Sequence, residues 1–188
     1  MEELHGKYLS FFLKGEEYAI NISQIIEIIG MQAITQIPKT PDSIKGVINL
    51  RGKIIPIMDL RLKFGMEEKE YDERTCTIVV EIERDGEQRQ VGLIVDTVNE
   101  VTNIENIDAP PTYDEQGYEK FILGIGKLKE RVIMILDIKD VISTADADIA
   151  NAATGKVEAK EEAKENYNNF KSKIESKCRN HNLNNTKN

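Results

Sequence analysis

The chain has 188 residues, 40% of them apolar, and a formal net charge of −8 at pH 7. An acidic chain without tryptophan is poorly suited to nucleic acid, because phosphates need basic surfaces and unpaired bases stack on aromatic rings. No apolar run approaches the roughly 20 residues of a membrane span, so we expect no direct membrane insertion and a cytoplasmic location.

The first predicted elements are two strands joined by a turn. Residues 7–13 are rich in aromatic and aliphatic side chains, which favour a strand. Lys14-Gly15-Glu16 supplies a turn, and residues 17–20 return as the second strand. Residues 33–37, further along the chain, are expected to be a short strand or an extended run.

The isoleucine-rich segment at residues 22–29 is predicted to form a short helix. Asn21 or Ser23 could cap its start, and Gly30 could end it. The helical spacing is carried by four side chains, Ile22, Ile25, Ile26 and Ile29. The plainest interpretation is a helix that packs on a barrel.

The stretch from Gly46 to Gly65 reads as strand, tight turn, strand and short helix. Arg51-Gly52 separates two apolar runs, and glycine readily takes the positive φ of a two-residue hairpin turn. Pro56 cannot donate a ladder hydrogen bond, so the second strand should meet an edge or a bulge there. Asp59 is expected to cap a helix over residues 60–64.

The middle of the chain continues the strand pattern. Residues 76–82 form a nearly continuous apolar strand, and Asp85-Gly86 is a strong hairpin signal. Residues 90–95 return with Gly92 inside the strand, which predicts a bulge or a close approach by another backbone. Residues 98–107 carry the chain onward to a polar loop that ends near Phe121.

The hairpin pattern returns near an offset of 78 residues, between Gly124 and Ile142. At this offset apolar residues match apolar residues, and basic residues match basic ones. Asp137 falls where Asp59 stands in the first copy. At a slightly shorter offset Ile25, Glu27 and Ile28 match Val98, Glu100 and Val101. We therefore predict an internal repeat, with two related β-rich halves in one compact unit.

The composition changes near residue 145 and divides the chain into two parts. Residues 1–145 carry a net charge of −9, and residues 146–188 carry a net charge of +1. The second part is a charged tail whose residues 156–179 could form a helix, since apolar side chains recur there at three- and four-residue spacing. Its last residues are expected to be disordered from their composition.

The sequence offers no convincing catalytic, cofactor or metal site. It has no phosphate-binding glycine loop, no zinc-type cluster and no nucleophile elbow. His5 and His181 lie in predicted floppy termini, and Cys76 and Cys178 have no metal or disulfide spacing. Asp96 follows an apolar strand and is interpreted as a capping or hydrogen-bonding residue.

Several of these segments together resemble the CheW family of bacterial chemotaxis coupling proteins. The run IKGVINLRGKIIPIMDLRLKFG matches the family signature, and GEEYAINISQIIEI, VGLIVDTVNEV and GIGKLKERVIMILDI extend the likeness over residues 7–143. The resemblance implies a mainly β fold of two small five-stranded Src-homology-3-like barrels. These share a hydrophobic seam and carry short helices and a C-terminal tail.

The resemblance also implies an adaptor without catalysis or cofactor. Its partners would be the regulatory domain of the histidine kinase CheA and the cytoplasmic tips of methyl-accepting chemoreceptors. CheW-like domains also occur in CheA and in the adaptor CheV, but this chain has no room for a kinase core and its tail does not look like a receiver domain. The alternative from another class is a small β-barrel enzyme or cofactor-binding module that shares the pattern.

The resemblance places protein-binding residues at eight positions, without dividing them between kinase and receptor. The apolar candidates could equally be plain core, whereas Arg51 stands in a turn with no folding need for arginine. Its planar guanidinium suits a carboxylate, and Glu27 is the candidate partner. The eight positions are Ile25, Glu27, Ile28, Gly46, Asn49, Arg51, Gly92 and Val98.

Overall fold

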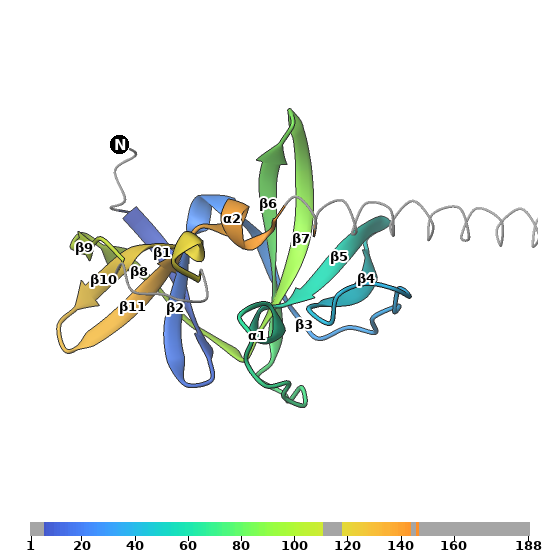
Figure 1. The fold of residues 1–188 in the computed structure, drawn as a ribbon, viewed down its shortest axis with the longest axis horizontal. Coiled ribbons are helices and arrows are strands. Elements are labelled where there is room, and N and C mark those ends of the chain that lie inside the picture. Colours follow the sequence, from blue (N-terminus) through green and yellow to red (C-terminus); the bar gives the residue numbers. More distant parts are fainter. Residues whose placement is uncertain (1–5, 111–117, 144–145, 147–188) are drawn as a thin grey trace, which may run out of the picture.

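The computed structural model describes residues 6–110, 118–143 and 146, and strands dominate this part of the chain (Figure 1). Five strands form one sheet, here called barrel one. In order across the sheet they are β3 (Ile25–Gly30), β6 (Cys76–Arg84), β7 (Glu87–Val95), β5 (Lys53–Asp59) and β4 (Ile44–Leu50).

The second sheet, here called barrel two, takes its strands from both ends of the described chain. In order they are β8 (Thr97–Ile104), β1 (Gly6–Leu13), β2 (Glu16–Asn21), β11 (Arg131–Leu136), β10 (Ile122–Leu128) and β9 (Ile107–Asp108). The short helices are η1 (Ile22–Gln24), α1 (Leu60–Lys63), η2 (Tyr118–Phe121) and α2 (Ile138–Val141). The two barrels expected from the sequence are confirmed, although the two-residue β9 gives the second one a sixth strand.

Strand registers match between the two halves of the predicted internal repeat. The β4–β5 ladder shifts register just before Gly46, which lies opposite Ile57. The β10–β11 ladder shifts just before Gly124, which lies opposite Ile135. The edge strands β3 and β8 carry equivalent shifts against β6 and β1. Each half thus repeats the same irregularities as well as the same strands.

The predicted hairpin turns and helix caps are present. Arg51 and Gly52 have φ of 53° and 85°, and Asp85 and Gly86 have φ of 54° and 78°. Positive φ at both central residues matches the right-handed twist of the flanking strands. The side chain of Asp59 caps α1 by accepting hydrogen bonds from two backbone N–H groups, and Asp137 caps α2 in the same way.

The helix predicted over residues 22–29 is wrong. Only η1 is helical, capped by Asn21, whose Oδ1 accepts from the Ser23 N–H at 2.9 Å. From Ile25 the chain pairs with β6, and burial alternates along β3. The isoleucine spacing suits a helix as well as a strand, but β-branched side chains favour the pleated surface that β6 offers.

Of the two expectations for Pro56, the edge strand is wrong. β5 lies inside its sheet, between β7 and β4. Pro56 lies opposite Val47, whose N–H and C=O both bond to Thr35 on the other side, at 2.9 and 2.8 Å. Position 56 therefore needs no donor. The register shift next to Gly46 supplies the bulge, one pair further along the ladder.

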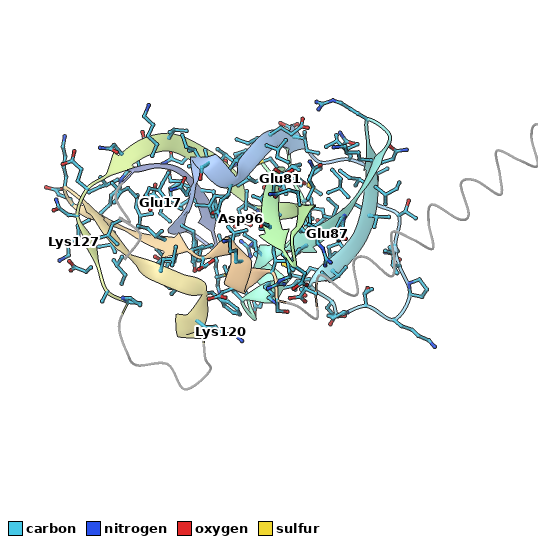
Figure 2. The ribbon with its side chains drawn as sticks, turned by 90° about the horizontal axis from the view of Figure 1, so that it is seen from above. Glu17, Glu81, Glu87, Asp96, Lys120 and Lys127 are labelled. Atoms are coloured by element: carbon cyan, nitrogen blue, oxygen red, sulfur yellow. The ribbon has the colours of Figure 1, made fainter. Side chains whose placement is uncertain are left out.

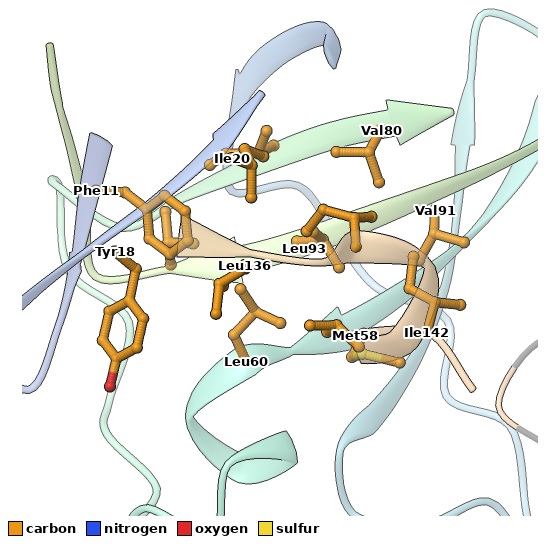
Figure 3. Close-up of a cluster of buried hydrophobic side chains, with 14 of the residues drawn as sticks. Phe11, Tyr18, Ile20, Met58, Leu60, Val80, Val91, Leu93, Leu136 and Ile142 are labelled. Atoms are coloured by element: carbon orange, nitrogen blue, oxygen red, sulfur yellow. The ribbon is translucent and has the colours of Figure 1, made fainter. Parts of the chain in front are cut away.

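Three apolar clusters hold the molecule together. Each barrel has its own small interior, around Ile55 and Ile57 in barrel one and around Ile133 and Ile135 in barrel two. The third and largest cluster is the seam between the barrels, as the sequence predicted. Figure 3 shows it drawing on both sheets, including Phe11, Tyr18, Ile20, Val80, Val91 and Leu93.

The tail predictions, including the possible helix at 156–179 and the disordered end, fall outside the described residues. The same holds for His5, His181 and Cys178. Among the residues that are described, no helix has the length and hydropathy needed to cross a membrane.

Candidate functional site

Arg51 and Glu27 form an ion pair on the surface of barrel one, as the sequence suggested. Both terminal guanidinium nitrogens donate to the two carboxylate oxygens at 2.7 Å. The Arg51 side chain is 74% exposed and that of Glu27 is 21% exposed. The pair ties the tip of the β4–β5 hairpin to the edge strand β3, and it leaves one face of the guanidinium in solvent.

Asn49 supports the turn that presents this arginine. Its Oδ1 accepts a hydrogen bond from the Gly52 N–H at 2.8 Å, and the residue itself is exposed. This side-chain bond replaces part of the backbone pairing that a tight turn leaves unmade. Asn49 therefore positions Arg51, and the residue lies on the surface.

The neighbours of Glu27 along β3 are apolar. Ile26 and Ile28 are 43% and 45% exposed, whereas Ile25 is partly buried against the seam. β3 is an edge strand, so it also presents unpaired backbone groups. Exposed isoleucines along an open edge are features of a protein-binding surface.

The edge strand β8 of barrel two has a comparable surface. Val98 is partly buried against the seam, as Ile25 is, while Val101 is 55% exposed. Val101 was missing from the predicted site, although the repeat aligned it with Ile28. The sequence predicts Val101 once each candidate residue is matched with its counterpart in the other copy of the repeat.

Gly46 and Gly92 lie inside barrel one and not on its surface. A Cβ on Gly46 would stand 2.1 Å from the Thr35 carbonyl oxygen, and the backbone φ there is 139°. A Cβ on Gly92 would stand 2.5 Å from the Ile57 side chain, in a ladder without a bulge. The bulge or close backbone approach predicted at Gly92 is therefore wrong, because the close neighbours are side chains, those of Ile57 and Thr77. Both glycines act through packing.

A second ion pair marks the equivalent place in barrel two. Glu100, which the repeat aligns with Glu27, accepts from Arg131 in the β10–β11 hairpin. Arg131 also lies 3.7 Å from Glu17, whose side chain is only 6% exposed. Figure 2 places Glu17 well inside barrel two. Arg131 therefore neutralises a buried carboxylate, which Arg51 does not.

The chemistry of this surface is that of recognition. It combines a guanidinium held by a carboxylate, an exposed amide and exposed aliphatic side chains. Within the described ranges, no group of three or more His, Cys, Asp or Glu side chains could hold a metal ion. Asp96 serves as a hydrogen-bonding residue, as predicted, because it accepts from Arg61 and from the Lys14 N–H.

Comparisons with known proteins agree with one another. A family model described as a CheW-like domain matches residues 7–146. A chemotaxis protein CheW from Klebsiella aerogenes is 40% identical over 145 residues, covering 76% of this chain and 85% of the relative. One from Bacillus subtilis is 34% identical over 138 residues, covering 72% and 86%.

A solved structure shows the same likeness. The scaffolding protein TtCheW from Thermoanaerobacter tengcongensis matches with a TM-score of 0.67 and 35% identity. The match covers 76% of this chain and 96% of that chain. Its coverage agrees with a likeness that stops near residue 146, where the charged tail begins.

Proposed function

The chain belongs to the family of CheW-like domains, and from that premise we propose that it is a non-catalytic adaptor in chemotaxis signalling. It joins the regulatory domain of the histidine kinase CheA to the cytoplasmic tips of chemoreceptors. This role places it in the cytoplasm. The observation that carries the proposal is the family match over 7–146, together with an open, edge-strand surface on barrel one.

Arg51 and Glu27 are the centre of the proposed binding surface. In the free protein the pair is well solvated and adds about 0–1 kcal/mol to stability. A partner that covers it desolvates both charges, so the loss of either one then weakens the complex more than the fold. Ile28 supplies apolar contact area on the other face of β3, and Asn49 holds the turn.

The other four predicted residues are buried or half-buried, and they support this surface through packing. Ile25 and Val98 are half-buried in the seam, where they couple each edge strand to the common core. Gly46 and Gly92 allow the strands of barrel one to pack closely enough to hold the surface in shape. We assign none of the eight residues to the kinase or to the receptor alone.

The proposal is tested by Arg51→Ala in a reconstituted mixture of kinase and receptor fragments. We expect kinase activation to be lost while the melting temperature changes by less than about 4 °C. Glu27→Ala should give a milder form of the same defect. Lys53→Ala, an exposed charge two residues away, is the matched control and should activate like the wild type. Normal activation by Arg51→Ala would show that Arg51 is only a solvated turn residue.

The alternative of a small barrel enzyme or cofactor-binding module receives no support from the proteins matched above, whose names describe chemotaxis and scaffolding. A turnover screen with the purified chain would test it directly. Saturable activity that disappears with a single substitution would favour an enzyme over an adaptor.

A further inference from the structure

The chain passes between the barrels twice, and the two crossings are built differently. The first crossing runs from β2 to β3 through η1. The second runs from β7 to β8 through a single residue, Asp96. In Figure 2, Asp96 lies near the middle of the molecule, between the barrels.

Asp96 is fastened to both barrels at once. Its backbone N–H donates to the Phe12 carbonyl at 3.1 Å, and its Oδ2 accepts from the Lys14 N–H at 2.9 Å. Both partners belong to barrel two. From α1 on the side of barrel one, Arg61 donates through Nε and a terminal nitrogen to the two carboxylate oxygens. The Arg61 and Asp96 side chains are only 13% and 15% exposed.

The carboxylate is held in its charged form. Burial by itself raises the pKa of Asp96, but hydrogen bonds from Arg61 and from the Lys14 N–H bring it below its ordinary value. A bidentate arginine–carboxylate pair has one preferred geometry, whereas apolar contacts have no preferred direction. The seam therefore holds the barrels together, and this pair adds a fixed orientation.

The repeat reveals what the first crossing lacks. The offset that aligns Glu27 with Glu100 also aligns Ser23 with Asp96 in the sequence. The offset that aligns Asp59 with Asp137 aligns Arg61 with Lys139. Ser23 carries no charge, and Lys139 forms no ion pair with any residue that the structure describes. Instead they line a polar cleft of about 680 Å³ between the sheets. One crossing is closed by an ion pair, whereas at its counterpart Arg84 of β6 donates to the Ile142 and Lys139 backbone carbonyls, at 2.8 and 3.4 Å.

We propose that Arg61 and Asp96 are positioning residues that set the relative orientation of the two barrels, and through it the binding surface. This inference rests on the proposed adaptor function. Glu27 lies on β3 of barrel one, and Val98 lies on β8, two residues after Asp96. A partner that contacts both edge strands needs them at a fixed separation and angle, which this pair supplies.

The test uses the full chain with Asp96→Asn, which keeps the shape of the side chain but removes its charge. Spin labels at Lys53→Cys and Glu130→Cys, with both native cysteines replaced by serine, report the distance between the two exposed hairpin tips. Lys139→Ala, which leaves the carbonyl that accepts from Arg84 in place, is the matched control at the first crossing. Affinity for a receptor-tip fragment and for the CheA regulatory domain is measured on unlabelled variants.

At a temperature where the variant is folded, we expect Asp96→Asn to broaden the distance distribution between the spin labels. We also expect its affinity for at least one of the two partners to fall by about fivefold or more. Asp96→Glu, which restores the charge, should recover much of both effects. An unchanged distance distribution overturns the positioning role. A broadened distribution with unchanged affinities overturns its link to binding. If even the wild type binds neither partner, the proposed function fails while the distance measurement still decides the positioning role.

Discussion

Replacing Arg131 with alanine should cost stability, whereas replacing Arg51 should not, although both pair with equivalent glutamates. Among the described residues Arg51 pairs with Glu27 alone, and its side chain is 74% exposed. Arg131 is 44% exposed, yet it faces the buried Glu17 as well as Glu100. Both variants thus remove a surface ion pair. Arg131→Ala also leaves the buried Glu17 carboxylate without its nearby cation.

The magnitude follows from what remains around Glu17. Without Arg131, its described side-chain partner is the Asn99 amide, which donates to Oε1 at 3.1 Å. Leaving a buried carboxylate short of a partner costs about 1–2 kcal/mol. For a domain of this size that lowers the melting temperature by about 4–8 °C. The exposed Arg51 pair contributes about 0–1 kcal/mol.

Thermal and urea unfolding of both variants checks this expectation. Lys129→Ala, in the same turn as Arg131 and without an ion pair among the described residues, is the control. Adding Glu17→Gln to Arg131→Ala should restore part of the loss, because the buried group then carries no charge. If Arg131→Ala and Arg51→Ala unfold at the same urea concentration, Glu17 does not depend on Arg131 and the reasoning fails.

Three further predictions concern packing and pH. Gly92→Val should lower the free energy of unfolding by about 1–3 kcal/mol, because its Cβ meets Ile57, whereas Gly30→Ala in open space should stay within about 0.5 kcal/mol; urea unfolding compares them. Gly46→Ala should cost more than about 2 kcal/mol by the same measurement, since a backbone oxygen lies 2.1 Å from the new Cβ. Asp96 has a lowered folded pKa, so its contribution is present above the unfolded pKa of about 4 and is lost as pH falls below it. As the pH is lowered through the acid range, the melting temperature of Asp96→Asn should therefore fall less than that of the wild type.

The hairpin at residues 46–59 and its later copy were predictable because local signals agreed with one another. Arg51-Gly52 specifies the turn, Asp59 specifies the helix cap, and the apolar runs specify the strands. When the same combination recurs in one chain, each copy supports the interpretation of the other. The ion pair between Arg51 and Glu27 could also be proposed, since the planar guanidinium of a turn arginine suits a carboxylate on a neighbouring element.

The segment at residues 22–29 shows where local reasoning stops. Its isoleucines suit a helix and a strand, and only the presence of β6 as a pairing partner decides between them. The burial of Glu17 has the same character. Nothing around position 17 marks it as buried, because the burial comes from strands that lie far away in the sequence. The position of β5 inside its sheet likewise depends on its parallel pairing with β7.

The two crossings have a consequence for synthesis on the ribosome. All strands of barrel one lie between Ile25 and Val95, so this barrel can close as soon as that stretch has emerged. Barrel two begins first but finishes last, because β1 pairs with β8 and β2 pairs with β11, and both of these partners follow barrel one in the chain. The hairpin of β1 and β2, with the apolar side chains of Phe11 and Leu13, must therefore wait until β8 and then β11 have been translated. During that interval those side chains can pack against the half of the seam that the newly closed barrel one already presents.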